Sequence, residues 1–225
     1  MEITSFGSAC VRLRGREGVV VADAFASVVG PTGRGLTADL VTYSHRDPPS
    51  PGAGRSNGRT PSTEEGVPTS LQPAFRLEGP GEYEVHDVLV TGIRTARDES
   101  RGAERGLNTA FVVLLDGLHV IHLGDLGHLL TEEQLREIGP VDVACVPLGG
   151  HLSAARAAEV VAQLEVNLVV PLLVAENGAD SEAALAKFLH EMGVKDLTPQ
   201  PKLVVTVSSV PEETTVALLE SRARA

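Results

Sequence analysis

The hydrophobic residues of the first half of the chain recur in short runs that are typical of β-strands. Such runs at residues 1–6, 9–13, 19–24 and 39–44 are joined by polar or glycine-containing turns, which predicts an antiparallel meander. Further strands are predicted at 74–79, 83–93 and 109–124, the last being a hairpin about the tight-turn dipeptide Asp116-Gly117. Polar loops are predicted at about 48–72 and at 94–106.

Beyond residue 130 the hydrophobic period changes from that of strands to that of helices. Thr131 and Gln134 have the spacing of a capping box, and the helix that they begin is predicted to end at Gly139. Helices at 153–164 and 181–193 alternate with strands at 141–149 and 167–173, and two more strands are predicted at 201–209 and 214–220. This order favours the α/β (α+β) class, with helices outside the sheets and one domain over residues 1–225.

The composition excludes several classes of function. No run approaches the about 20 apolar residues of a membrane span, and the first residues do not resemble a signal peptide, so we expect a cytoplasmic protein without membrane association. Cys10 and Cys145 lie in apolar runs, where reduced core thiols are usual. A net charge of −11 and an aromatic content of 3% argue against nucleic acid as a partner.

Several ordered stretches of the chain carry a resemblance to a known family. They are MEITSFGSACVRL with VVVADAF, DLVTYSH, GPGEYEVHDVLVTGI, GLNTAFVVLLDGLHVIHLGDLGH and VDVACVPLGG. In order and spacing they resemble the metallo-β-lactamase fold, and within it the small metal-dependent hydrolases that include the ascorbate-phosphate lactonases. The resemblance implies a four-layer αββα sandwich, and a homo-oligomer because relatives are often oligomeric.

The resemblance also implies where metal ligands would stand. Relatives carry S/T-H-x-H-x-D-H at a strand end, whose imidazole and carboxylate groups suit zinc or manganese and whose bound water becomes an attacking hydroxide. That motif aligns with residues 44–50, and three further ligands align with Arg97, Asp125 and Leu173. The seven family ligand positions are thus occupied by His45, Asp47, Pro49, Ser50, Arg97, Asp125 and Leu173.

These replacements predict that the dinuclear metal site has been lost. Arg97 replaces a histidine, and we expect its guanidinium to supply the positive charge of the metal by pairing with Asp125 and with Asp47. The protein would then hold no cofactor and would be an inactive homologue that acts in binding, regulation or assembly.

Two other interpretations remain open. His45, Asp47 and Asp125 could hold one divalent ion, zinc, manganese or iron, and hydrolyse a small phosphorylated or lactone-like substrate. Alternatively, Arg97 and Arg46 could hold a small anionic ligand in the cleft.

Structural roles are equally open for several of these side chains. His45 could be a hydrogen-bonded histidine closing a strand, and Asp125 could accept backbone N–H groups in a tight turn. His128 and His151 follow glycine-rich turns and could line the same cleft. The arginines at 94, 97, 101 and 105 could meet an anion or belong to a solvated loop.

Overall fold

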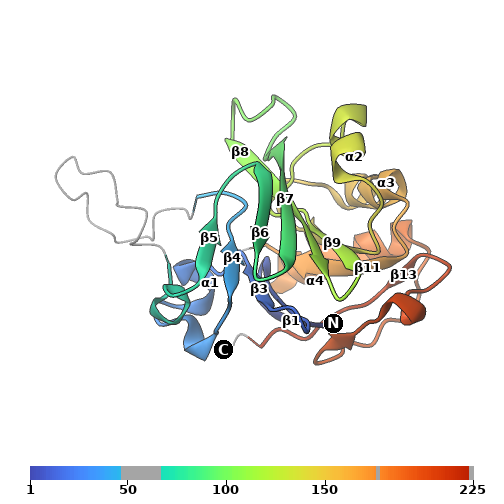
Figure 1. The fold of residues 1–225 in the computed structure, drawn as a ribbon. Coiled ribbons are helices and arrows are strands. Elements are labelled where there is room, and N and C mark those ends of the chain that lie inside the picture. The colour runs from blue at the N-terminus through green and yellow to red at the C-terminus, as the bar shows by residue number, and fades with distance from the viewer. Residues whose placement is uncertain (47–66, 176–177, 223–225) are drawn as a thin grey trace.

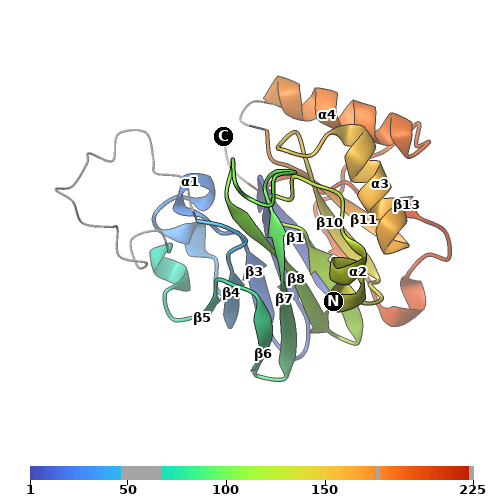
Figure 2. The ribbon, with the colours of Figure 1, turned by 90° about the horizontal axis from the view of Figure 1, so that it is seen from above.

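Two stacked β-sheets with helices on both outer sides make up the described part of the chain. The computed structural model describes residues 1–46, 67–175 and 178–222. Figure 1 shows the sheets with α2, α3 and α4 gathered beside the C-terminal sheet. Figure 2, seen from above, shows α1 outside the N-terminal sheet and the other helices outside its partner. The predicted αββα sandwich is confirmed, with a thinner helical layer on the N-terminal side.

The N-terminal sheet has six strands in the order β12-β1-β2-β3-β4-β5. Their bounds are β1 (Glu2–Gly7), β2 (Cys10–Arg14), β3 (Val19–Ala22), β4 (Leu40–Thr42), β5 (Phe75–Leu77) and β12 (Leu203–Val204). The first three strands are antiparallel, as predicted. The predicted meander is wrong for the next step: β4 pairs parallel with β3. The chain crosses over through α1 (Ala26–Val29) and the 3₁₀ turn η1 (Gly33–Gly35), and such a crossover returns the strand in the same direction.

The C-terminal sheet has seven strands in the order β13-β11-β10-β9-β8-β7-β6. Their bounds are β6 (Gly81–Val85), β7 (Val88–Ala96), β8 (Leu107–Leu115), β9 (Leu118–His122), β10 (Val143–Leu148), β11 (Leu168–Leu173) and β13 (Thr215–Val216). The predicted hairpin about Asp116-Gly117 is confirmed by the antiparallel pairing of β8 with β9. β9, β10 and β11 run parallel, so their carboxyl ends meet at one edge of the sheet.

Side-chain caps begin the helices α2 and α3, whereas α1 begins without one. α2 (Glu132–Ile138) starts with the predicted capping box, in which the Thr131 side chain accepts from the Gln134 backbone N–H and the Gln134 side chain accepts in return. α3 (Ala154–Leu164) is capped by the Ser153 side chain. α4 (Gly178–Glu191) begins earlier than the predicted residue 181.

Alternation along the strands divides the core into two layers. In β8, Phe111, Val113 and Leu115 pack between the sheets. Ala110 and Val112 face the helices α2–α4 instead, because successive side chains of a strand point to opposite faces. Cys10 and Cys145 are buried free cysteines, as predicted. None of the described helices is long and apolar enough to cross a membrane.

The segment predicted as a loop at 48–72 is only partly described. Residues 47–66 lie outside the described part of the chain, and with them Asp47, Pro49 and Ser50. At its end the prediction is wrong, because Thr69–Leu71 form the 3₁₀ turn η2. Leu71 is buried against the outer face of the N-terminal sheet, and this burial fixes the turn.

Candidate functional site

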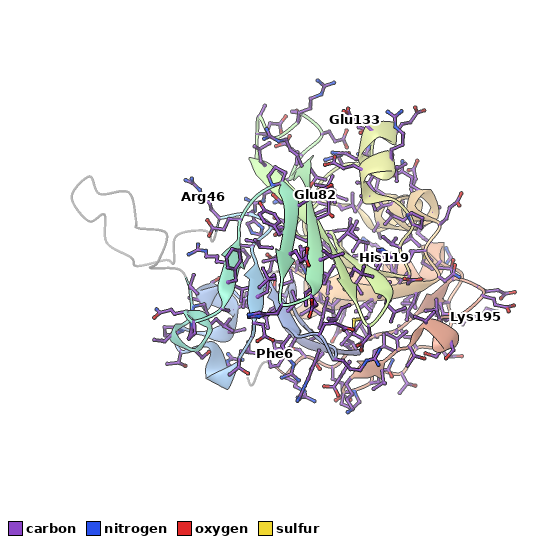
Figure 3. All side chains as sticks on the ribbon, in the orientation of Figure 1. Phe6, Arg46, Glu82, His119, Glu133 and Lys195 are labelled. Carbon is purple, nitrogen blue, oxygen red and sulfur yellow. The ribbon has the colours of Figure 1, made fainter. Side chains whose placement is uncertain are left out.

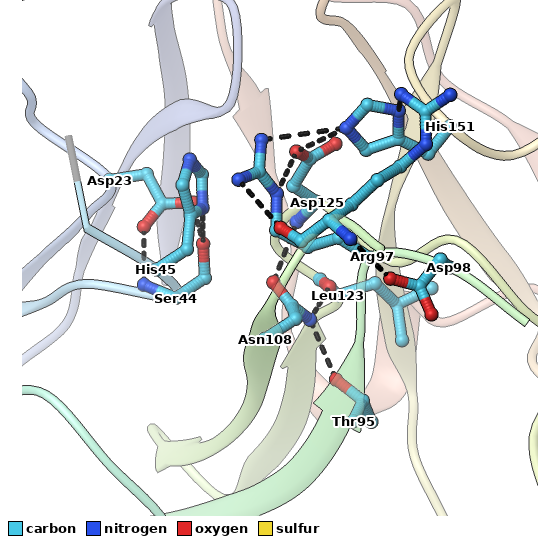
Figure 4. A network of polar contacts seen from close by, with 11 residues as sticks. Asp23, Ser44, His45, Thr95, Arg97, Asp98, Asn108, Leu123, Asp125 and His151 are labelled. Atoms are coloured by element: carbon cyan, nitrogen blue, oxygen red, sulfur yellow. Dashed lines mark hydrogen bonds and ion pairs between the residues drawn. The ribbon is translucent and has the colours of Figure 1, made fainter. Parts of the chain in front are cut away.

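Three strand ends from both sheets bring the candidate site together. β4 is followed by Ser44 and His45, β7 by Arg97, and β9 by a turn that carries Asp125. The Thr109 backbone N–H of β8 donates to the Ser44 carbonyl at 2.7 Å, which joins the two sheets at this edge. Residues that are distant in the sequence therefore face one another, as Figure 4 shows.

An ion pair between Arg97 and Asp125 is the central contact of the site. The Arg97 Nε donates to the Asp125 Oδ2 at 2.7 Å. The side chains are 26% and 14% exposed, so the pair is partly shielded from water. The predicted pairing of these two residues is confirmed, whereas pairing of Arg97 with Asp47 lies outside the described residues.

His151 and Arg105 extend this ion pair into a four-residue group, the arginine–histidine cluster (Arg97, Arg105, Asp125 and His151). The His151 Nε2 is 3.3 Å from the Asp125 Oδ2, and the Arg105 Nη1 is 3.1 Å from the His151 Nδ1. Neutral imidazole has one donor and one acceptor nitrogen, so Nε2 donates to the carboxylate and Nδ1 accepts from the guanidinium. Burial lowers the pKa of His151 below its usual value, with Arg105 and Arg97 acting in the same direction against Asp125.

A buried asparagine fixes the position of Asp125. The Asn108 Oδ1 accepts from the Asp125 backbone N–H at 2.9 Å, while its Nδ2 donates to the Thr95 Oγ1 at 2.7 Å and to the Leu123 carbonyl at 2.9 Å. All of its hydrogen bonds therefore serve the strands and turn that present Asp125. The sequence analysis missed Asn108, and its place in a largely apolar strand was the available signal.

A second polar chain leads to His45 from the N-terminal sheet. Asp23 is almost completely buried and accepts from the Ser44 backbone N–H at 2.7 Å and from the Ser44 Oγ at 2.6 Å. The Ser44 Oγ lies 2.8 Å from the His45 Nδ1, and the imidazole ring packs against Phe25 with 4.8 Å between centroids. Asp23 has a φ of +48°, a strained conformation that tends to occur at functional sites.

Close backbone approaches leave no room for side chains in the turn around Asp125. A Cβ at Gly124, where φ is +64°, would lie 2.3 Å from the Ser44 Cβ. A Cβ at Gly127 would lie 2.1 Å from the Arg97 carbonyl oxygen. The glycines flanking Asp125 are therefore required for this turn to contact both Ser44 and Arg97.

Asp98 organises the loop that carries Arg105. Its carboxylate accepts from the backbone N–H groups of Gly102, Glu104 and Arg105 at 2.8, 3.1 and 2.6 Å. Burial would raise the pKa of Asp98, but these hydrogen bonds outweigh it and lower the pKa below its usual value. The loop is thus built on an internal carboxylate, a feature that the solvated-loop interpretation did not include.

The remaining predicted residues divide between the site and its surroundings. Leu173 ends β11 and packs against the core beside the helices. His128 does not join the arginine–histidine cluster but accepts from the Ala96 N–H through Nε2 and bonds the Leu129 carbonyl through Nδ1. Arg46 follows His45 and is exposed at the surface, as Figure 3 shows.

The described residues do not fit a divalent metal ion at Asp125. The Arg97 guanidinium contacts the Asp125 Oδ2 at 2.7 Å and brings a positive charge to this carboxylate. Two positive charges of a dication about 4 Å from a guanidinium would repel it by about 8 kcal/mol at an effective dielectric constant of 20. Within residues 1–46, 67–175 and 178–222, no three His, Cys, Asp or Glu side chains are grouped so that they could hold a metal ion.

Comparisons with known proteins place the fold in a family. A family model described as a beta-lactamase superfamily domain matches residues 2–173. A UPF0173 metal-dependent hydrolase of Pyrococcus abyssi is 34% identical over 96 residues, which are 41% of this chain and only 43% of that relative. One from Methanoregula boonei is 30% identical over 184 residues, 76% of this chain and 81% of the relative.

Solved structures agree with the sequence comparisons. A Thermotoga maritima protein, assigned as a zinc-dependent hydrolase of the metallo-β-lactamase superfamily, has 27% identity and a TM-score of 0.70 over 98% of this chain and 99% of its own. An isothiocyanate hydrolase from Delia radicum gut bacteria has 11% identity and a TM-score of 0.59 over 92% and 100%, which shows the shared fold alone. The chain belongs to the metallo-β-lactamase-fold family of metal-dependent hydrolases.

Proposed function

We propose that this chain is a metal-free member of its family that binds a ligand at the former metal position instead of hydrolysing a substrate there. In this proposal the Arg97 guanidinium replaces the metal as the positive charge beside Asp125. The protein would then act in binding, regulation or assembly, and it would be inactive as a metal-dependent hydrolase.

The observation that carries the proposal is the Arg97–Asp125 ion pair at 2.7 Å. Charge-assisted hydrogen bonds of this length are among the stronger polar contacts in proteins. Asp125 is also held by Asn108 and faces His151. A metal ion would have to displace Arg97 and overcome its repulsion, and the sequence offers Leu173 and Pro49 where ligating side chains would be needed.

The second candidate is a hydrolase with one metal ion, and His45 favours it. Metal-binding histidines usually hydrogen-bond an outer partner through their second ring nitrogen, and the Ser44 Oγ occupies that place at His45 Nδ1. In this candidate His45, Asp47 and Asp125 would hold zinc, manganese or iron. The substrate class would be a small phosphorylated or lactone-like molecule, and Arg97 would have to leave Asp125.

Metal content separates the two candidates. The protein is purified without chelator and dialysed separately against zinc, manganese and ferrous iron, and its metal content per chain is measured by inductively coupled plasma mass spectrometry. We expect far less than one ion per chain, and no hydrolysis of p-nitrophenyl phosphate or of a simple lactone above the rate in buffer alone. One tightly held ion per chain that Asp125→Asn removes would overturn the proposal in favour of the hydrolase.

A further inference from the structure

We propose that Arg97 and Arg105, positioned by His151, form a binding site for an oxyanion, the phosphate or carboxylate group of a small molecule. This inference rests on the proposed function, because a metal ion at Asp125 would take the place of Arg97. It extends that function by naming the ligand chemistry and by assigning roles to Arg105 and His151.

The two guanidinium groups converge on one imidazole ring. The Arg105 Nη1 is 3.1 Å from His151 Nδ1, and the Arg97 Nη2 is 3.4 Å from His151 Nε2. The Arg97 Nη1 also donates to the Arg105 carbonyl at 3.3 Å, which ties the two arginines together. In the view of Figure 4 the Arg97 guanidinium extends from Asp125 toward the side of the site that carries His45.

The cluster carries an excess of positive charge. Among the described residues, Asp125 contacts the Arg97 guanidinium and His151, whereas the Arg105 guanidinium contacts the ring of His151. The nearby Asp98 turns its oxygen atoms to backbone N–H groups of its own loop. Asp98 keeps its negative charge and acts on His151, but no carboxylate of the described residues forms an ion pair with Arg105. A small anion could therefore bind beside the unpaired Arg105 guanidinium, in a protein whose net charge is −11.

The donors are available and held in place. A guanidinium has five N–H donors, and at Arg97 one is used by Asp125 and one by the Arg105 carbonyl. The Arg97 and His151 side chains are 26% and 23% exposed, so a small molecule can reach them. Asp98 fixes the Arg105 backbone, which lowers the entropy lost on binding. Paired N–H groups match a ligand group with two or more oxygens, since carboxylates and phosphates accept such forks.

Calorimetric titration with inorganic phosphate, with acetate and with chloride at equal ionic strength tests the site. We expect saturable binding of phosphate or acetate, and the arm that binds more tightly names the ligand group. Arg105→Gln should weaken that binding about tenfold or more, because it removes a charged hydrogen-bond donor. The matched control is Arg101→Gln, which removes the same charge from an exposed position of the same loop and should leave the affinity unchanged.

Equal affinities in the Arg105→Gln and Arg101→Gln proteins, or no saturable binding of either oxyanion, would overturn the oxyanion site. A circular-dichroism melt of each variant confirms that it is folded. The metal measurement described above is made on the same sample: absence of both metal and oxyanion binding overturns this inference alone, whereas one metal ion per chain overturns the proposed function with it.

Discussion

Replacing Arg97 by methionine tests whether a guanidinium has taken over the neutralisation of Asp125. Methionine keeps much of the side-chain volume but removes the charge and all five donors. The Asp125 carboxylate, 14% exposed, then loses the partner that now lies 2.7 Å away. The neutral His151 Nε2–H, 3.3 Å from the same oxygen, remains a donor, but it cannot balance the charge of a partly shielded carboxylate as the guanidinium does.

The expected size lies between two known limits. Exposed ion pairs contribute about 0–1 kcal/mol, and breaking a buried pair costs about 3–5 kcal/mol. With side chains 26% and 14% exposed, Arg97→Met should cost about 2 kcal/mol. For a chain of 225 residues this corresponds to a thermal midpoint lower by about 4–8 °C.

Thermal and urea unfolding followed by circular dichroism measure this change. The control is Arg16→Met, because Arg16 is 86% exposed and its Nε lies 3.3 Å from Asp116, so the loss should stay below about 0.5 kcal/mol. Adding Asp125→Asn to Arg97→Met should recover part of the loss, which a double-mutant cycle quantifies. If Arg97→Met unfolds like the wild type and the coupling energy is near zero, the charge-replacement hypothesis is refuted.

Three further predictions concern the groups around this pair. The pKa of His151 is lower in the folded protein than in the unfolded chain, so the unfolded chain binds a proton more readily. The free energy of unfolding should therefore be highest above pH about 6.5 and should fall as the pH drops below that value. In urea titrations at several pH values, His151→Gln should reduce this pH dependence, and an unchanged dependence would contradict the prediction. Gly127→Ala should cost about 3 kcal/mol or more, because the new methyl group would meet the Arg97 carbonyl, whereas Gly79→Ala, with no atom within 4 Å, should melt within about 2 °C of the wild type. Asn108→Ala removes three hydrogen bonds, two of them buried and one partly buried, and should lower the free energy of unfolding by about 3 kcal/mol in urea titrations; a loss below about 1 kcal/mol would contradict its supporting role.

Local features of the fold were predictable because they depend on neighbours in the sequence. The capping box of Thr131 and Gln134 and the hairpin at Asp116-Gly117 both join residues a few positions apart. The parallel pairing of β3 with β4 was not predictable in the same way, because the hydrophobic pattern of a short strand does not show the direction in which the strand pairs. The crossover through α1 sets that direction, and its helix of four residues is too short to give a clear helical pattern in the sequence.

The sequence by itself determined the fold class and the family, and by resemblance it placed Arg97 at a position where relatives carry a histidine. It could also indicate that Arg97 would pair with Asp125, since opposite charges stood at two positions that belong to one site in relatives. Only the tertiary structure showed that Arg105 and His151, 46 residues apart in the sequence, contact each other beside the Arg97–Asp125 ion pair. Only the tertiary structure showed that the Asn108 side chain holds the backbone of Asp125. The physical reason is that the residue type fixes which donors and acceptors a side chain has, whereas its partner depends on which strand ends pack together at one edge of the sheets.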